Sequence, residues 1–317
     1  MQQNQVRSIV YSLQQNIRRV IVGKDEAIEL ALIALLCKGH VLIEDVPGVG
    51  KTTLVAALAR SLSCSFKRIQ FTPDVTPSDI TGFTMPSLQT GEMEYKSGAV
   101  MSQIVLADEI NRTSPKTQSS LLEVMEEGQV TVDGTTYRMP SPFIVLATQN
   151  PVDFVGTYPL PEAQLDRFFM RVSIGYPSQE EEIDILERYT SGARPMEELK
   201  PICSSQDIVK LQQQVDTVYT SREVRAYISA IAAASRRNGA LQLGVSTRAA
   251  ISLLRAGQAR ALLMGRDYVS PEDIQKMAEP VLAHRLVLSP EARMRNMTAQ
   301  RVLGNILGAV QVPVKAR

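Results

Sequence analysis

The segment 41–53 constrains the fold of this chain more than any other, because it joins an apolar strand to a glycine-rich turn and then to a helix. It reads VLIEDVPGVGKTT. Residues 41–43 predict a buried strand, and Gly48 and Gly50 permit backbone conformations in which successive N–H groups turn inward around an anion. The Ala- and Leu-rich stretch 53–61 predicts a helix whose positive N-terminal end points at the same anion. The segment therefore predicts polyphosphate binding at a strand-to-helix turn.

Individual residues of this turn have separate expected roles. Lys51 is expected to reach the β- and γ-phosphates of a nucleotide, and the hydroxyl of Thr52 to ligate Mg²⁺. The strict pattern has glycine at position 45, where this chain has Asp45. Because Asp tolerates a left-handed backbone, we expect the loop to close nevertheless. The alternative interpretation is a glycine-rich turn that carries a surface lysine. The predicted nucleotide contacts in this turn are Val46, Pro47, Gly48, Val49, Gly50, Lys51, Thr52 and Thr53.

A second apolar strand, 104–108, ends in two adjacent carboxylates, Asp108 and Glu109. Ligands of parallel sheets gather at the carboxyl ends of the strands, so both acids are expected beside Thr52. We predict that Asp108 orients the Mg²⁺ shell and that Glu109 acts as the base that polarises a water for in-line attack. The alternative is an ordinary pair of acids in a polar turn.

Two further polar residues are candidates for contacts to the phosphates. Asn150 follows the apolar strand 143–148, where it could hold the attacking water or a γ-phosphate oxygen; the alternative is a turn started by Asn150 and Pro151. Arg248 lies two residues after the expected helix cap Ser246. A cation there opposes the helix dipole, which indicates an anion nearby, although a solvated arginine is the simpler alternative.

Arg167 is the candidate for a residue that acts on a neighbouring subunit. It follows Asp166 and precedes the apolar pair 168–169, which is expected to anchor the segment while Arg167 projects outward. Such an arginine can neutralise charge that develops in the transition state of phosphoryl transfer. The alternative is a surface ion pair with Asp166.

The pattern along the chain predicts two domains. Residues 1–175 alternate strand-like and helix-like segments, which predicts an α/β core with a parallel sheet flanked by helices. Hairpins are expected at 84–96 and 131–137. Residues 176–317 are predicted to be entirely helical, without strands, as a small lid domain with an amphipathic C-terminal helix docked on it. The predicted strands are 41–44, 67–71, 104–108, 143–148 and 171–174.

Composition excludes several other classes of protein. A net charge of +1 over 317 residues gives no basic field, so no nucleic acid partner is expected. The three cysteines are far apart and show no metal-ligand or disulfide spacing, so they are expected to be buried apolar residues; the two histidines are expected to be structural. The sequence has neither a signal peptide nor a membrane-spanning segment, so we expect a cytoplasmic location without membrane insertion.

Taken together, six segments closely resemble the MoxR family of AAA+ ATPases, and the resemblance covers nearly the whole chain. They are VGK at 22–24, the glycine-rich turn, LADEINR at 106–112, ATQNP at 147–151, LPEAQLDRF at 160–168 and GVSTR at 244–248. The resemblance implies sensor 1 at Asn150, an arginine finger at Arg167, sensor 2 at Arg248 and a nucleotide contact at Val22. In this family Asp commonly stands at the position of Asp45.

The resemblance also implies an activity and partners. ATP and Mg²⁺ would bind between the subunits of a hexameric ring. Such proteins remodel or mature other proteins in a chaperone-like manner, for example during metal-cofactor insertion, often beside a partner with a von Willebrand factor A domain. Two alternatives remain open from the residues. One is a nucleotide-gated binding module with little turnover, which would not need Glu109 as a base; the other is a metal-chelatase-like ATPase subunit.

Overall fold

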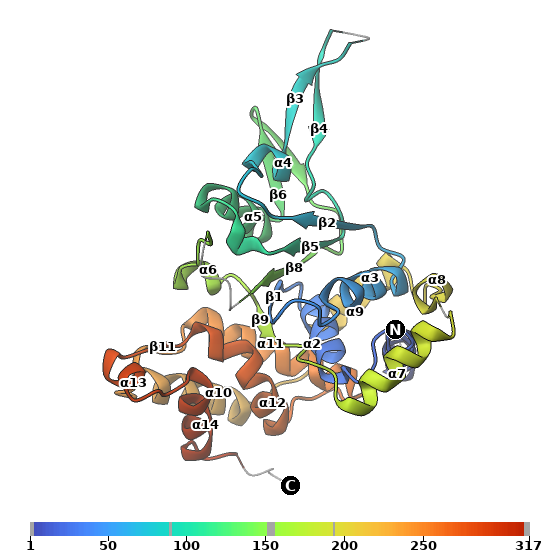
Figure 1. The fold of residues 1–317 in the computed structure, drawn as a ribbon. Helices are drawn as coiled ribbons and strands as arrows, with labels where there is room; N and C mark the ends of the chain where they lie inside the picture. Colours follow the sequence, from blue (N-terminus) through green and yellow to red (C-terminus); the bar gives the residue numbers. More distant parts are fainter. Residues whose placement is uncertain (1–2, 89–90, 151–155, 193, 314–317) are drawn as a thin grey trace. The chain divides into compact units, whose positions relative to one another are not determined.

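A computed structural model describes residues 3–88, 91–150, 156–192 and 194–313 (Figure 1). The chain divides into two compact units, which are treated separately below. The sheet unit comprises Tyr11–Leu160 and Val172–Val209, and the helical unit comprises Met1–Val10, Pro161–Arg171 and Lys210–Arg317. The predicted domain boundary after residue 175 stays a proposal, and the compact units divide the chain at different positions. No helix of the described residues is long and apolar enough to cross a bilayer.

The central sheet has the strand order β2-β5-β8-β1-β9. The pairs β2–β5, β5–β8 and β8–β1 are parallel, which confirms the predicted fold class. Every residue of β5 is buried, as its continuous apolar sequence requires in a sheet covered on both faces. All five predicted strands are present, with bounds shifted by one or two residues in three of them: β1 (Val41–Glu44), β2 (Phe66–Gln70), β5 (Ile104–Asp108), β8 (Ile144–Gln149) and β9 (Met170–Val172).

The register of the sheet sets which residues meet at its carboxyl edge. Gln70 on β2 lies opposite Asp108 on β5, and Glu44 on β1 lies opposite Gln149 on β8. The turns that follow β1, β5 and β8 therefore leave the sheet at the same edge. This arrangement brings the glycine-rich turn and the two carboxylates together.

Helices in the sheet unit begin at residues suited to the first turn. Ser114 caps α5 by accepting a hydrogen bond from the Thr117 N–H, and Pro115 follows it at the first helical position. Ser178 and Glu181 form a capping box at the start of α7, as predicted. The helices are α2 (Asp25–Leu36), α3 (Lys51–Ser61), α4 (Pro77–Thr81), the 3₁₀ turn η1 (Ile110–Arg112), α5 (Pro115–Glu127), α7 (Gln179–Thr190) and α8 (Pro195–Glu198); α1 (Gln3–Arg18) and α9 (Ser205–Val215) each contribute to both units.

Both predicted hairpins are confirmed. One pairs β3 (Gly82–Pro86) with β4 (Met93–Ser97) and projects away from the sheet; the other pairs β6 (Gln129–Val132) with β7 (Thr135–Arg138) (Figure 1). The two hairpins contact each other, because the rings of Tyr95 and Tyr137 stack with centroids 3.9 Å apart. They therefore form one accessory structure on the sheet unit.

The helical unit contains the predicted bundle and one feature that the prediction missed. Ser246 caps α11 by accepting from the Ala249 N–H, as expected. The expectation of no strands beyond 175 was wrong, since β10 (Leu241–Leu243) and β11 (Val287–Leu288) pair antiparallel. Strands of three and two residues are too short to show a period of two in sequence. The helices are α6 (Glu162–Leu165), α10 (Arg222–Arg236), α11 (Thr247–Leu263), α12 (Pro271–Leu282), the 3₁₀ turn η2 (Ala283–Arg285), α13 (Pro290–Met294) and α14 (Ala299–Ala309).

Single-residue expectations outside the site are mostly confirmed. On α14, Val302 and Ile306 are buried, which confirms the docked C-terminal helix. Cys37 and Cys203 are buried as expected, whereas Cys64 is only half-buried because it follows the end of α3 rather than lying within an element.

Candidate active site

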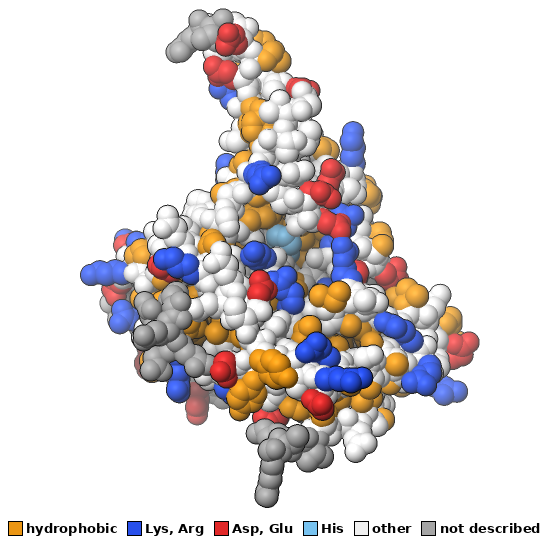
Figure 2. Space-filling model, turned by 180° about the vertical axis from the view of Figure 1, so that it is seen from behind, with side chains coloured by type: hydrophobic (Ala, Val, Ile, Leu, Met, Phe, Trp, Pro, Cys, Tyr) orange, Lys and Arg blue, Asp and Glu red, His pale blue; other side chains and the backbone are white. Residues whose placement is uncertain are grey.

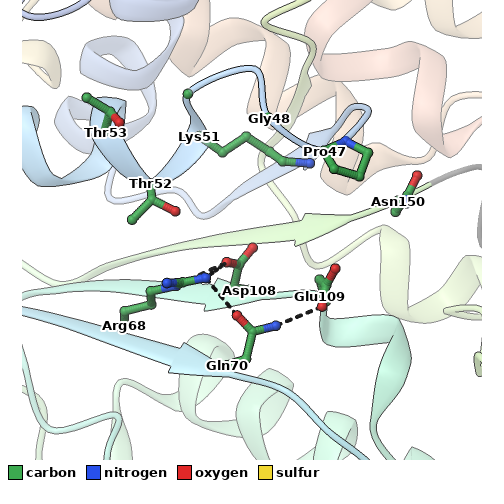
Figure 3. A pocket seen from close by; sticks show the side chains of 11 residues that line it. Pro47, Gly48, Lys51, Thr52, Thr53, Arg68, Gln70, Asp108, Glu109 and Asn150 are labelled. Atoms are coloured by element: carbon green, nitrogen blue, oxygen red, sulfur yellow. Dashed lines mark hydrogen bonds and ion pairs between the residues drawn. The ribbon is translucent and has the colours of Figure 1, made fainter. Parts of the chain in front are cut away.

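A pocket of about 420 Å³ lies at the carboxyl edge of the sheet, within the sheet unit (Figure 3). Residues from four separate segments line it: the glycine-rich turn with the start of α3, the end of β2, the end of β5 and the residue after β8. These segments are brought together only by the strand order of the sheet. The lining residues are Pro47, Gly48, Gly50, Lys51, Thr52, Thr53, Arg68, Gln70, Asp108, Glu109 and Asn150.

The glycine-rich turn adopts the conformation that its sequence requires. Gly48 and Gly50 have φ values of 85° and 87°, a region that side-chain-bearing residues rarely adopt. Gly50 is the N-cap of α3, and Lys51 is its first helical residue. The first turn of a helix has N–H groups without intrahelical acceptors, so this end of α3 presents donors and a partial positive charge to the pocket.

The Lys51 side chain crosses the turn. Its Nζ donates a 2.7 Å hydrogen bond to the carbonyl oxygen of Asp45. Burial lowers the pKa of Lys51 from its ordinary value, while the nearby charges of Asp45, Asp108 and Glu109 act in the opposite direction. A partly desolvated cation facing acids is a strong partner for phosphate oxygens, because the interaction is weakly screened.

Asp45 has a different role from the one expected. It is not among the residues with positive φ, so its place in the turn does not depend on a left-handed backbone. Its Oδ2 instead accepts hydrogen bonds from the N–H of Ile174 at 2.5 Å, the N–H of Gly175 at 2.7 Å and the hydroxyl of Ser173 at 3.1 Å. The carboxylate therefore ties the glycine-rich turn to the segment after β9, a contact that glycine cannot make.

Asp108 is held through both carboxylate oxygens. Oδ1 accepts a 2.6 Å hydrogen bond from the Thr148 hydroxyl. Oδ2 accepts two hydrogen bonds from Arg68, from Nε at 3.1 Å and from Nη2 at 2.7 Å. Arg68 thus neutralises the carboxylate that is predicted to orient Mg²⁺.

Glu109 has a left-handed backbone conformation, and its side chain accepts a hydrogen bond from another residue of the site. With φ 58° and ψ 49° it is left-handed, a conformation that costs a non-glycine residue of order 1 kcal/mol or more and is concentrated at functional sites. Its N–H donates to the Thr148 hydroxyl at 2.8 Å, and its Oε2 accepts from Gln70 Nε2 at 2.7 Å. The Nε of Arg112 is 3.4 Å from the same Oε2.

Asn150, the other predicted residue at this edge, is buried and lines the pocket where β8 ends (Figure 3). Among the predicted contacts, Val46, Val49 and Val22 are not lining residues. The N–H of Val46 donates to its neighbour Asp45, and Val22 is half-buried between α1 and α2. Pro151, the residue of the alternative turn, lies outside the described residues.

Arg167 and Arg248 belong to the helical unit. Arg167 follows Asp166, the C-cap residue of α6, and Arg248 is in the first turn of α11. Within the unit, Arg248 Nη1 is 3.9 Å from Asp166 Oδ2. Their roles toward nucleotide stay predictions.

Three residues of the site were not predicted from the sequence: Arg68, Gln70 and Thr148. Arg68 and Gln70 are two apart on β2, so both lie on the same face of the strand, and Ile69 between them is buried. That alternation of polar and apolar residues at a strand end is a signal that could have found the first two. Thr148 is fully buried within an apolar strand, and its role depends on the pairing of β5 with β8.

The oxygen ligands available in the pocket suit a magnesium ion that binds together with a nucleotide. The hydroxyl of Thr52 and the carboxylate of Asp108 line the same pocket. Among the described residues there is no group of three His, Cys, Asp or Glu residues that could hold a metal alone. Mg²⁺ is typically held by one or two protein groups together with phosphate oxygens and water, which is the composition available here.

Comparison with known proteins identifies the family. Residues 40–170 match the family model described as "ATPase family associated with various cellular activities (AAA)", and residues 233–306 match the AAA lid domain. The chaperone MoxR1 of Mycobacterium tuberculosis is 42% identical over 306 residues, which cover 94% of this chain and 80% of that protein. This chain belongs to the MoxR family of AAA+ ATPases. The family assignment agrees with the resemblance that the motifs indicated.

Two further proteins match nearly end to end. The uncharacterized protein YeaC of Bacillus subtilis is 53% identical, over 95% of this chain and 94% of that protein. A solved structure from Cytophaga hutchinsonii has a TM-score of 0.92 and 38% identity, over 98% of this chain and 97% of that chain. Both the pocket and the helical unit therefore lie within the region of similarity to these two proteins.

Proposed function

We propose that this MoxR protein is a Mg²⁺-dependent ATP hydrolase that remodels a protein client in a chaperone-like manner. The observation that carries the proposal is the convergence of Lys51, Asp108 and Asn150 on one pocket. These residues come from three segments about 40 or more positions apart in sequence. A cation, a carboxylate and an amide around a helix N-terminus form the arrangement that phosphoryl transfer requires.

Each residue has a separate part in the proposed reaction. The N–H groups of the glycine-rich turn and Lys51 hold the β- and γ-phosphates, and Thr52 and Asp108 hold Mg²⁺. When bound, Mg²⁺ neutralises negative charge on the phosphate oxygens. Glu109 orients a water and accepts its proton as the water oxygen bonds to the γ-phosphorus; the bond to the bridging oxygen breaks, and ADP and phosphate leave.

The proposal extends to a ring of subunits, with a hexamer as the expected state. Arg167 would act on the nucleotide of the neighbouring subunit, and Arg248 would contact the nucleotide bound by its own chain. Arginine fingers contribute roughly 10³ to 10⁵ in rate, so an isolated subunit should hydrolyse ATP very slowly. Light scattering with and without ATP tests the assembly, and a monomer under both conditions would contradict it.

The proposed client is a protein, and the proposed partner carries a von Willebrand factor A domain. Metal-cofactor insertion is one setting for such an action. The name of the relative MoxR1 supports chaperone action. The β3–β4 hairpin exposes apolar side chains suited to protein contact, and hydrophobic groups are visible along it in Figure 2. They are Phe83, Met85, Leu88 and Met93.

Two variants test the hydrolase proposal. Lys51→Ala should abolish binding of a fluorescent ATP analogue, whereas Glu109→Gln should bind it normally and lose phosphate release. Mixing Glu109→Gln with Arg167→Ala tests the action in trans. The Arg167→Ala subunits keep a complete pocket and should regain activity from the intact fingers of their neighbours. Normal hydrolysis by Lys51→Ala would overturn the site assignment.

A nucleotide-gated binding module is the second candidate, and one observation favours it. Glu109 Oε2 already accepts a hydrogen bond from Gln70 Nε2, so one oxygen of the expected base is engaged by the protein itself. A module of this kind would show equal, slow phosphate release with Glu109 and with Glu109→Gln. A large loss in the variant would instead favour the hydrolase.

A further inference from the structure

The segment that carries Arg167 is held by two consecutive residues of the 3₁₀ turn η2, His284 and Arg285. Arg285 Nη2 donates to the carbonyl oxygen of Phe168 at 2.6 Å and to that of Asp166 at 3.3 Å. His284 Nε2 lies 3.1 Å from the same Phe168 oxygen. The backbone is therefore tied on both sides of Arg167, by contacts that lie wholly within the helical unit.

Arg285 is a buried charged residue that forms an ion pair with the segment carrying Arg167. Its side chain is 4% exposed, and its Nε lies 3.2 Å from Asp166 Oδ1. Burial lowers the pKa of Arg285 to about 10, while Asp166 acts in the opposite direction and Arg248 in the same direction as burial. A buried cation needs a fixed counter-charge, so Arg285 and Asp166 constrain each other.

Asp166 has a second arginine on its other side. Arg248 Nη1 is 3.9 Å from Oδ2, and the Arg248 side chain is 52% exposed. The buried Arg285 is thus the stronger partner of Asp166, because exposed ion pairs such as that of Arg248 contribute little. The geometry fixes Asp166, and with it the next residue, Arg167, to η2.

We propose that Arg285 is a positioning residue for Arg167: it fixes the finger segment to the helical unit through the carbonyls of residues 166 and 168 and the carboxylate of Asp166. This inference rests on the proposed function, in which Arg167 acts on the neighbouring nucleotide. Arg285 itself does not contact the nucleotide in this scheme. Its loss should therefore impair the sites of neighbouring subunits and leave the subunit's own pocket intact.

The test uses the full chain with Arg285→Gln, with Arg237→Gln as the matched control. Arg237 is an exposed arginine of the same unit, and its Nε donates to the carbonyl oxygen of Ala233 in the preceding helix, α10. We expect Arg285→Gln to bind a fluorescent ATP analogue within about twofold of the unmodified protein and to lose ~10²-fold in kcat, the usual cost of a misplaced group. Unchanged kcat would overturn the inference.

Mixed rings separate positioning from general damage. Arg285→Gln subunits keep a complete pocket, and Glu109→Gln subunits keep a well-placed finger. Equimolar mixing should therefore raise phosphate release at least tenfold above Arg285→Gln alone. If mixing with Glu109→Gln subunits restores phosphate release to Arg167→Ala but not to Arg285→Gln, the inference about Arg285 is wrong. The proposed function would be unaffected by that result. If Arg167→Ala is not rescued either, the action in trans is itself wrong.

A conservative variant covers the case in which Arg285→Gln does not fold. Arg285→Lys keeps a positive charge beside Asp166. Lysine lacks the planar fork of guanidinium donors, so it cannot bond the Phe168 carbonyl and face the Asp166 carboxylate at the same time. We expect a smaller loss of kcat with a melting temperature close to that of the unmodified protein, and the same rescue on mixing. A full loss that Glu109→Gln subunits do not rescue would contradict the role in positioning.

Discussion

Gln70 donates a 2.7 Å hydrogen bond to the carboxylate of Glu109, from the last residue of β2 to the first residue after β5. The same Gln70 accepts a 2.8 Å hydrogen bond from Arg68, whose guanidinium also bonds Asp108. Two residues of β2 thus engage both carboxylates of the site (Figure 3). Asp108 Oδ2 and Glu109 Oε2 therefore each already accept a hydrogen bond from a residue of β2.

We expect Gln70→Ala to raise kcat for ATP hydrolysis, because Glu109 would no longer have to leave a hydrogen bond before it can act on water. A neutral-to-charged hydrogen bond has a net value of about 1.5 kcal/mol, so the increase should be up to about tenfold, with KM within about twofold. Steady-state phosphate release measures both. Gln213→Ala, at an exposed position of α9, is the control. A fall in kcat would mean that Gln70 assists Glu109 instead.

Arg68→Gln should lower the Mg²⁺ concentration required for half-maximal hydrolysis. The Arg68 side chain is 48% exposed, so its pair with Asp108 has a net value of about 1 kcal/mol, equivalent to roughly a fivefold change. A Mg²⁺ titration at fixed ATP measures the shift, and EDTA should abolish hydrolysis in every variant. Arg237→Gln is the control for removing an arginine. A higher Mg²⁺ requirement in Arg68→Gln would contradict competition between Arg68 and the metal.

Asp45→Gly restores the strict glycine pattern of the turn and should nevertheless destabilise the protein. The change removes the acceptor of the Ile174 and Gly175 N–H groups and of the Ser173 hydroxyl. Donors left without an acceptor cost roughly 1–3 kcal/mol each when buried, so we expect a loss of about 3 kcal/mol in the free energy of unfolding. Urea denaturation measures it. Asp45→Asn, which keeps an oxygen acceptor, should lose less; equal stability of Asp45→Gly would show that these bonds contribute nothing.

His40 makes the stability of the sheet unit depend on pH. Its Nδ1 accepts the Val145 N–H and its Nε2 lies 2.9 Å from the Met125 carbonyl, so the neutral ring with hydrogen on Nε2 satisfies both. Burial lowers the pKa of His40 to about 4. The unfolded chain, with an ordinary pKa near 6.5, binds the proton first as pH falls, so stability decreases below about pH 6.5.

The expected loss from His40 is on the order of 3 kcal/mol by pH 4. Denaturation of the unmodified protein and of His40→Leu between pH 7 and pH 4 measures it as the difference in slope. Burial also lowers the pKa of His284, to about 3, so the variant should keep the part of the pH dependence that comes from His284. Identical slopes in the two proteins would contradict the assignment to His40.

Local patterns were sufficient to predict much of the site. The apolar runs before Glu44 and Asp108 predicted two strands, and the glycines of the turn predicted its positive φ values. The hairpin at 131–137 was predicted from Asp133 and Gly134, which indeed have φ values of 48° and 79°. Such features are determined within a few residues, so a single sequence contains the information.

Other parts depended on which strands become neighbours. Arg68 meets Asp108 only because β2 pairs with β5 in one register, and Thr148 reaches the same carboxylate only because β8 lies on the other side of β5. A shift of one residue would turn each side chain to the opposite face. Nothing within β2 itself specifies that register.

By itself, the sequence determined a phosphate-binding turn, the acids at the end of a buried strand and the family to which the chain belongs, because each depends on short-range backbone preferences and on contiguous motifs. Only the tertiary structure decided what those groups contact: Asp45 with the segment after β9, Glu109 with Gln70, and Asp166 with Arg285. These partners are between about 40 and 130 residues apart, and packing rather than local preference brings them within hydrogen-bonding distance.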